Sequence, residues 1–303
     1  MNAVATVSSE EPGVEPSSSL LAPDFLRRLE RLKLLARRRF RGAASGSRRA
    51  RAKGSSAEFA DHRPYSPGDD TRRIDWNAYA RLGELVMRLY VAEQDLAVTL
   101  LLDRSASLGV GTPPKIQVAK RVAAALGYLG LSQGERVGVV PFADGVARPL
   151  EPGRGRGRVG KLLRYLDQVD VDGTTDLGRA VDSFLARRPR PGLVCVLSDL
   201  LDPGGFKRPL DRLISEGHEP AIFHILDAEE LEPTPGGDFA LIDVERGTRV
   251  EVSLDRHALA AYRARVSAFL ADVEGYARAR GLSYVRVGGD VDFEDALLTY
   301  LRS

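Results

Sequence analysis

The sequence predicts an α/β fold with a mostly parallel central sheet and helices on both faces. From Leu96 onward, short apolar runs alternate with amphipathic stretches, and oxygen-bearing side chains follow two of these runs where a strand would end. We expect strands near residues 96–102, 136–142, 192–198, 220–226 and 282–287, with a short added strand near 145–150. We expect helices near residues 115–131, 158–168, 177–187, 205–216, 256–280 and 292–301.

Four regions are predicted along the chain, and one of them carries an insertion. Residues 1–22 are rich in Ser, Pro and Glu, which is typical of a disordered tail. Residues 23–56 predict a basic amphipathic helix followed by a mobile linker. Residues 57–95 form a dense polar block that we expect to pack on the main domain, residues 96–303. Within that domain, about residues 228–254 break the strand–helix rhythm and predict an inserted β-hairpin.

The composition favours a protein of a reducing compartment. The chain has 303 residues, 43% of them apolar, so it can bury a sizeable core. Its single cysteine, Cys195, lies in an apolar run and excludes a disulfide framework. No run approaches the roughly 18–20 apolar residues of a membrane span, and the N-terminus lacks the features of a signal peptide. We therefore expect a cytoplasmic protein without a transmembrane segment.

The charge of the chain is uneven. The formal net charge is only +2, yet residues 27–53 carry twelve Lys and Arg against a single acid. In the same region Phe25, Leu29, Leu32 and Ala36 recur at helical spacing. Such a helix either docks its apolar stripe on the main domain or lies on a membrane surface or a nucleic acid. We favour docking because ordinary amphipathic helices are far commoner, and we do not expect a nucleic-acid partner.

Three short motifs rich in oxygen-bearing side chains predict a metal site. Asp-Arg-Ser-Ala-Ser at 103–107 and Ser198-Asp199 each follow an apolar run, and Gly-Thr-Thr-Asp at 173–176 opens a helix. Ligands of open α/β sheets bind beyond the carboxyl ends of the strands, so we expect these loops to meet. Hydroxyls and carboxylates without His or Cys suit Mg²⁺ or Mn²⁺, with Ca²⁺ as an alternative. The competing interpretation is that these residues only cap helices and turns.

The same motifs resemble the metal-ion-dependent adhesion site of von Willebrand factor A-type domains, which have a Rossmann-like sheet. By this resemblance the metal set is Asp103, Ser105, Ser107, Thr175 and Asp199. We expect the serines and the threonine to ligate the ion and both aspartates to orient its waters. Neutral direct ligands leave the ion short of negative charge, so it would accept an acidic side chain from a partner. Two positions depart from the family pattern. Thr174 replaces a Gly, so it could exchange roles with Thr175, and Leu200 stands where many members have Gly.

A second motif lies ahead of the main sheet, between residues 63 and 76. It is either a salt-bridged surface loop or an ordered lid or docking surface near the metal, with Asp69 or Asp70 capping a short helical turn. The residues considered for contact with the site or with a partner are Arg63, Tyr65, Asp69, Arg72, Asp75 and Trp76, together with Thr174 and Asp176. The stretch resembles the signature of domain-of-unknown-function family 58. The matching residues are Tyr65, Gly68, Asp69, Arg72, Ile74, Asp75 and Trp76.

This second resemblance covers about residues 45–303 and implies a partner of MoxR-type AAA+ ATPases. We therefore expect a non-enzymatic, metal-dependent adaptor in the chaperone-like assembly or maturation of client proteins. One alternative is a metal-dependent hydrolase of phosphoesters, for which Asp176 and Asp202 are the nearby candidate bases. The other is a binder of nucleic acid or of a membrane surface through the basic residues 27–53.

Overall fold

The computed structural model describes residues 20–43, 58–67, 69–91, 97–155, 157–233, 238–253, 255–288 and 293–302. The chain divides into two compact units. The larger unit comprises Met1–Ala36 and Leu96–Ser303, and the smaller one comprises Arg37–Asp95. Most of the predicted disordered tail and of the predicted linker lies outside the described residues.

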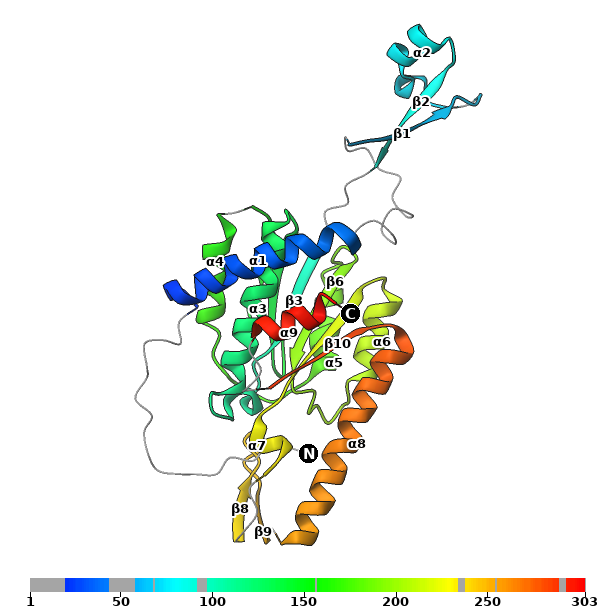
Figure 1. Cartoon of the computed structure of the whole chain (residues 1–303). Coiled ribbons are helices and arrows are strands. Elements are labelled where there is room, and N and C mark those ends of the chain that lie inside the picture. The colour runs from blue at the N-terminus through cyan, green and yellow to red at the C-terminus, as the bar shows by residue number, and fades with distance from the viewer. Residues whose placement is uncertain are drawn as a thin grey trace. The chain divides into compact units, whose positions relative to one another are not determined.

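A six-stranded sheet forms the centre of the larger unit (Figure 1). Its strands are β3 (Ala97–Asp103), β4 (Arg136–Phe142), β5 (Leu150–Gly153), β6 (Gly192–Ser198), β7 (Glu219–Ile225) and β10 (Ser283–Val287). They lie in the order β10-β7-β6-β3-β4-β5, and all neighbours are parallel except β4 and β5. Counted along the chain, this is the 3-2-1-4-5-6 order of doubly wound sheets. The predicted Rossmann-like α/β fold class is confirmed.

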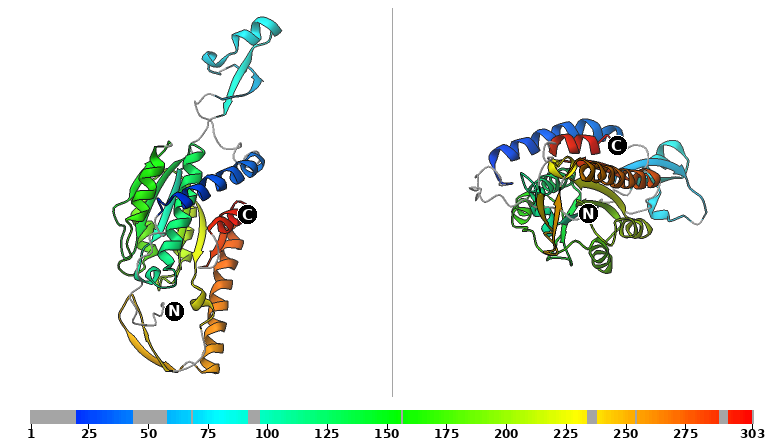
Figure 2. Two further views of the ribbon diagram at one scale, coloured as in Figure 1. Left: turned by 60° about the vertical axis from the view of Figure 1, so that its left-hand side comes forward. Right: turned by 90° about the horizontal axis from the view of Figure 1, so that it is seen from below.

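Helices cover both faces of this sheet (Figure 2). On one face, α3 (Lys115–Ser132) packs on β3 and β4 and contacts α4 (Arg158–Asp167) and α9 (Phe293–Tyr300). The other face carries α5 (Leu177–Ala186), α6 (Lys207–Ser215) and α8 (Arg256–Arg280). These helices follow the predicted ranges within about two residues at each end.

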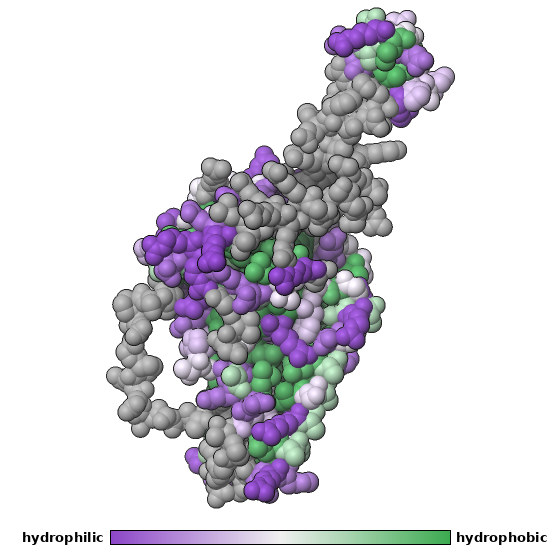
Figure 3. All heavy atoms as spheres, in the orientation of Figure 1, coloured by the Kyte–Doolittle hydropathy of each residue, from purple (hydrophilic) through white to green (hydrophobic). Residues whose placement is uncertain are grey.

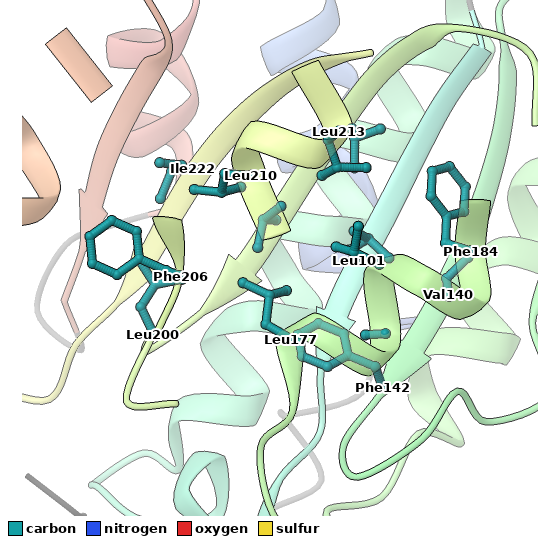
Figure 4. Packing of buried hydrophobic residues seen from close by; sticks show 14 of the residues in the cluster. Leu101, Val140, Phe142, Leu177, Phe184, Leu200, Phe206, Leu210, Leu213 and Ile222 are labelled. Atoms are coloured by element: carbon teal, nitrogen blue, oxygen red, sulfur yellow. The ribbon is translucent and has the colours of Figure 1, made fainter. Parts of the chain in front are cut away.

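The face under α5, α6 and α8 holds a continuous apolar cluster (Figure 4). Leu101 of β3 and Phe142 of β4 point toward Leu177 of α5, and Phe206 and Leu210 extend the cluster toward α6. Each of these side chains is at most 5% exposed. Burying a large apolar side chain contributes roughly 1.5–3 kcal/mol, so this layer holds the sheet and the loops at its end in place.

One predicted strand is displaced. We expected it near residues 145–150, but β5 covers Leu150–Gly153, and Val146 forms only an isolated bridge with Phe142. The displaced strand contains Pro152, which reads as a strand breaker in the sequence. Proline is tolerated here because β5 is an antiparallel edge strand.

The predicted basic helix is α1 (Pro23–Ala43), and its apolar stripe is docked within the larger unit. Leu29 and Leu32 are fully buried, and Phe25 packs against Phe293 of α9 with ring centroids 5.1 Å apart. The two helices lie side by side in Figures 1 and 2, and hydrophilic side chains cover the outer face of α1 (Figure 3). The side chain of Ala36 lies outside the described residues. Docking is therefore the structural role of this stripe.

The smaller unit is built on an antiparallel pair of strands, β1 (Glu58–Pro64) and β2 (Val86–Val91). Between them lie the 3₁₀ turn η3 (Thr71–Arg73) and the short helix α2 (Trp76–Leu82). The sequence predicted a strand at 85–91 but not its partner β1, whose residues are mostly polar and carry no clear alternation.

The predicted hairpin insertion is confirmed. It consists of β8 (Asp238–Ile242) and β9 (Arg249–Ser253), which pair with each other in a separate two-stranded sheet. The short helix α7 (Ala228–Leu231), which was not predicted, precedes it. Figure 1 shows the hairpin beyond the carboxyl ends of the central strands. Among the described residues, no helix is long and apolar enough to cross a membrane.

Candidate functional site

Two central strands deliver the aspartates of the predicted site to one edge of the sheet. β3 ends at Asp103 and β6 ends at Ser198, directly before Asp199. The two strands are parallel neighbours, with Leu102 opposite Leu197. Because the two strands end at the same level of the sheet, Asp103 and Asp199 lie in the same loop region. Both side chains are at most 1% exposed.

A chain of hydrogen bonds joins these aspartates through two serines. The Asp103 carboxylate accepts from the Ser105 amide at 2.9 Å and from the Ser198 hydroxyl at 2.5 Å. The Ser105 and Ser107 hydroxyl oxygens lie 3.0 Å apart, and Ser107 donates to Asp199 Oδ2 at 2.8 Å. Ser107 belongs to the short 3₁₀ turn η4 (Ala106–Gly109), which folds its hydroxyl back toward that of Ser105. We call Asp103, Ser105, Ser107 and Asp199 the hydroxyl cluster.

The donor set of the hydroxyl cluster fits a hard divalent cation. Adjacent ligands of an octahedral ion with metal–oxygen distances of about 2.0–2.1 Å lie about 3 Å apart. The serine oxygens have this separation and are buried. The described residues contain no group of three or more His, Cys, Asp or Glu side chains that could hold a metal. The hydroxyl cluster stays a predicted cation site.

The predicted threonine lies on the neighbouring loop and faces an unexpected partner. The Ala106 amide donates to the Gly173 carbonyl at 3.0 Å, which joins the serine loop to the threonine loop. Thr175 is 5% exposed, whereas Thr174 is half-buried. The Thr175 hydroxyl donates to Glu245 Oε1 at 2.8 Å, and its amide donates to Glu245 Oε2 at 3.3 Å. Of the two threonines, Thr175 is the more buried, and its role as a metal ligand stays a prediction.

A buried lysine next to the hydroxyl cluster was not predicted. Lys115, the first residue of α3, is 1% exposed, and its Nζ donates to Asp199 Oδ2 at 2.8 Å. The same Nζ donates to Glu230 Oε1 of α7 at 2.5 Å. In the sequence Lys115 reads as an ordinary surface residue at a helix start. The one feature of the sequence that could have indicated its burial is its position at the start of an apolar helix that follows the serine loop.

The charges of this region are arranged asymmetrically. Burial favours the neutral amine of Lys115, but the Asp199 and Glu230 carboxylates outweigh it, so the Lys115 pKa is raised. Burial acts against ionisation of Asp199, yet its ion pair with Lys115 lowers the Asp199 pKa. Burial raises the pKa of Asp103, and the charge of Asp199 raises it further. Asp199 therefore has a resident counter-charge, whereas Asp103 is held by an uncharged hydroxyl and an amide.

The loop after β6 is held in a conformation that suits glycine. Leu200 has φ 56, in the left-handed region, which glycine adopts more readily than leucine. Its amide donates to the Ser198 hydroxyl at 3.0 Å, and its side chain is 2% exposed in the core. The Asp199 carbonyl contacts His224 Nε2 at 3.0 Å, and burial lowers the His224 pKa to about 4. The backbone that presents Asp199 is thus fixed from both sides.

Two further aspartates near the site act as backbone caps. Asp176 Oδ1 accepts from the Arg179 amide at 2.7 Å and caps α5. Asp202 accepts from the amides of Leu177 at 2.7 Å and Gly204 at 2.6 Å. For these two residues the capping interpretation describes the observed contacts, in which Asp176 Oδ1 and both carboxylate oxygens of Asp202 accept backbone amides.

The predicted signature residues lie in the smaller unit, where they hold the block together. Arg63 pairs with Asp69 through bonds of 2.6 and 2.8 Å, and Asp70, not Asp69, caps η3. Asp75 caps α2 by accepting from the Asn77 and Ala78 amides. Three other residues of the block, Tyr65, Arg72 and Trp76, contribute less to this framework. Tyr65 and Arg72 donate through their backbone amides, to Leu85 and Asp70, and Trp76, 59% exposed, lies edge-on to Tyr79. The role of the block as a lid near the metal stays a prediction.

Comparisons with known proteins agree with the family expected from the signature block. The family described as "Protein of unknown function DUF58" matches residues 61–270. "Uncharacterized protein Rv1480" of Mycobacterium tuberculosis is 30% identical over 306 residues, covering 97% of this chain and 96% of that protein. "Uncharacterized protein Mb1516" of Mycobacterium bovis matches to the same extent. Among solved structures, the "conserved hypothetical protein BatB" of Bacteroides thetaiotaomicron has a TM-score of 0.45 and 18% identity, covering 68% of this chain and 97% of that one.

Proposed function

This chain belongs to the DUF58 family, and we propose that it is a non-enzymatic adaptor that binds an acidic side chain of a partner protein through a divalent metal ion. The observation that carries the proposal is the pair of buried serine hydroxyls 3.0 Å apart, bonded on one side to Asp199 and adjoining Asp103. Ser105, Ser107 and Thr175 would hold Mg²⁺ or Mn²⁺, and the two aspartates would position its waters.

The ligand chemistry explains why such a site would recognise a carboxylate. Hydroxyl ligands are neutral, so the bound ion keeps most of its positive charge and attracts an oxygen anion from outside the cluster. The resemblance to family 58 suggests which proteins provide it. These are a MoxR-type AAA+ ATPase and a client that is assembled or matured with its help. A cytoplasmic setting, supported by the single buried Cys195, is part of the same proposal.

A hydrolytic function is less well supported by the local contacts. Activation of a metal-bound water for phosphoester hydrolysis needs a general base within reach. Asp176 and Asp202, the candidate bases, already accept backbone hydrogen bonds. The apolar stripe of α1 is likewise engaged, because Phe25 and Leu29 are buried within the larger unit. Among the described side chains, these residues of the stripe leave no apolar face for a membrane surface.

Calorimetric titration of Mn²⁺ and Mg²⁺ into the full chain tests the proposal. Wild-type protein should bind one ion. Asp103→Asn should weaken binding by about 10–100-fold, because Asp103 positions the ligating loop. Ser105→Ala should also weaken it, whereas Ser215→Ala, a matched change at an exposed serine, should not. Equal affinity in all four proteins, or no binding by any of them, would refute the metal-dependent adaptor.

A further inference from the structure

The turn of the β8–β9 hairpin places a carboxylate on the rim of the proposed site. Both oxygens of Glu245 are used on one residue: Oε1 accepts from the Thr175 hydroxyl at 2.8 Å and Oε2 from the Thr175 amide at 3.3 Å. These contacts join residues 70 positions apart in the sequence. Thr175 is 5% exposed and Glu245 is half-buried, so the carboxylate covers Thr175 from its solvent side.

The turn is shaped so that it presents this side chain. Asp243 Oδ1 accepts from the amides of Glu245 at 3.0 Å and Arg246 at 3.1 Å. The Gly247 amide donates to the Asp243 carbonyl at 2.7 Å, and Gly247 has φ 69, a conformation that glycine adopts without strain. A turn held by three bonds to one aspartate keeps the backbone of Glu245 in one position, which lowers the entropic cost of its contact with Thr175.

The backbone hydrogen bonding of the hairpin is separate from that of the central sheet. Its strands form a sheet of their own and do not join the central sheet. Figure 1 shows it as a separate ribbon beyond the ends of the central strands. An element of this kind can leave its seat without disrupting the core, at the cost of the bonds at its tip.

We infer that Glu245 is an internal ligand: its carboxylate lies on Thr175 at the rim of the proposed metal site, where it takes the place of a partner's carboxylate, and a partner must displace it. This inference rests on the proposed function. It adds that the group recognised on a partner protein is a carboxylate carried on a tight turn. It also means that the resting protein is closed. Affinity for an acidic partner is lowered by the free energy of undocking the hairpin.

Hydrogen exchange in the metal-free full chain tests the closure directly, with Glu245→Gln as the variant and Glu251→Gln as its matched control. Glu251 is exposed on β9 of the same hairpin. Breaking a hydrogen bond to a charged group should accelerate exchange of the Thr175 amide, and of the turn at residues 243–248, by about tenfold or more. The control should exchange like the wild type. Unchanged exchange in Glu245→Gln would overturn the inference.

Water-proton relaxation with bound Mn²⁺ tests the occupancy, and acetate serves as the carboxylate probe. In Glu245→Gln, acetate should reduce the relaxation enhancement by displacing water from the ion, whereas the wild type and Glu251→Gln should respond at least tenfold more weakly. An equal response to acetate in all three proteins would overturn the internal-ligand role. If Mn²⁺ binds none of the three, the metal-dependent function fails, and the metal-free exchange result alone decides whether Glu245 closes the rim.

Discussion

Replacing Lys115 with methionine should destabilise the protein far more than an ordinary lysine substitution. Lys115 and Asp199 are each 1% exposed, and the Lys115 Nζ lies 2.8 Å from Asp199 Oδ2. At an effective dielectric constant of about 20, unit charges at this distance attract by about 6 kcal/mol. Methionine keeps most of the volume but leaves the Asp199 carboxylate without its counter-charge. Protonation of that carboxylate limits the loss, so we expect about 3–5 kcal/mol.

Urea denaturation of the full chain measures this loss, with Lys120→Met as the control. Lys120 lies on the same helix, is half-buried and donates only to the Asp167 carbonyl at 3.1 Å, so its replacement should cost about 1 kcal/mol or less. Mg²⁺ should restore more stability to Lys115→Met than to the wild type, because an added cation replaces the missing positive charge. A loss equal to that of the control would show that the buried ion pair between Lys115 and Asp199 does not stabilise the fold.

Three further predictions concern stability and can be checked by denaturation. Leu200→Ala should lower the free energy of unfolding by about 2–5 kcal/mol. Leu200→Gly should be more stable than Leu200→Ala by about 1 kcal/mol, because φ 56 disfavours a side chain. The reverse order of the two variants would exclude backbone strain at this position. Burial lowers the pKa of His218, so the unfolded chain takes up the proton before the folded protein does. The wild type should therefore lose stability relative to His218→Phe as the pH falls below about 6.5. A stability difference between the two proteins that does not change from pH 7.5 to pH 5 would contradict this. Leu32→Ala should lower the free energy of unfolding by about 2–3 kcal/mol and accelerate hydrogen exchange in α1. Leu26→Ala, at a half-buried position, should lower it less. Equal losses in the two variants would mean that the apolar stripe of α1 is not docked.

The sequence was most informative where a strand is buried on both faces. Strands β3, β4 and β6 read as nearly continuous apolar runs, because parallel strands between two helix layers face the core on both sides. Their ends could therefore be located to within one residue, and with them Asp103 and Asp199. The polar strand β1 gives no such pattern, since it belongs to a two-stranded sheet without a deep core.

The charged neighbours of the site could not be predicted for a different reason. Lys115 and Glu230 are 115 positions apart, and Thr175 and Glu245 are 70 apart. Propensity and periodicity report only on neighbours along the chain, so a lysine or a glutamate reads as a solvated residue unless its distant partner is known. The hairpin that carries Glu245 was predicted, but nothing in its local sequence indicates which loop of the protein it contacts.

The docking of α1 also determines when this protein can finish folding during its synthesis. The Arg28 guanidinium donates to Glu294 Oε1 at 2.8 Å, and these two residues are 266 positions apart in the sequence. The same guanidinium lies 4.4 Å from the centre of the Phe293 ring. This part of the α1 binding surface does not exist until α9 has left the ribosome, and α9 is synthesised after α1. Until then Phe25 lacks the Phe293 ring against which it packs, and a chaperone that shields this end of the apolar stripe would protect the nascent chain.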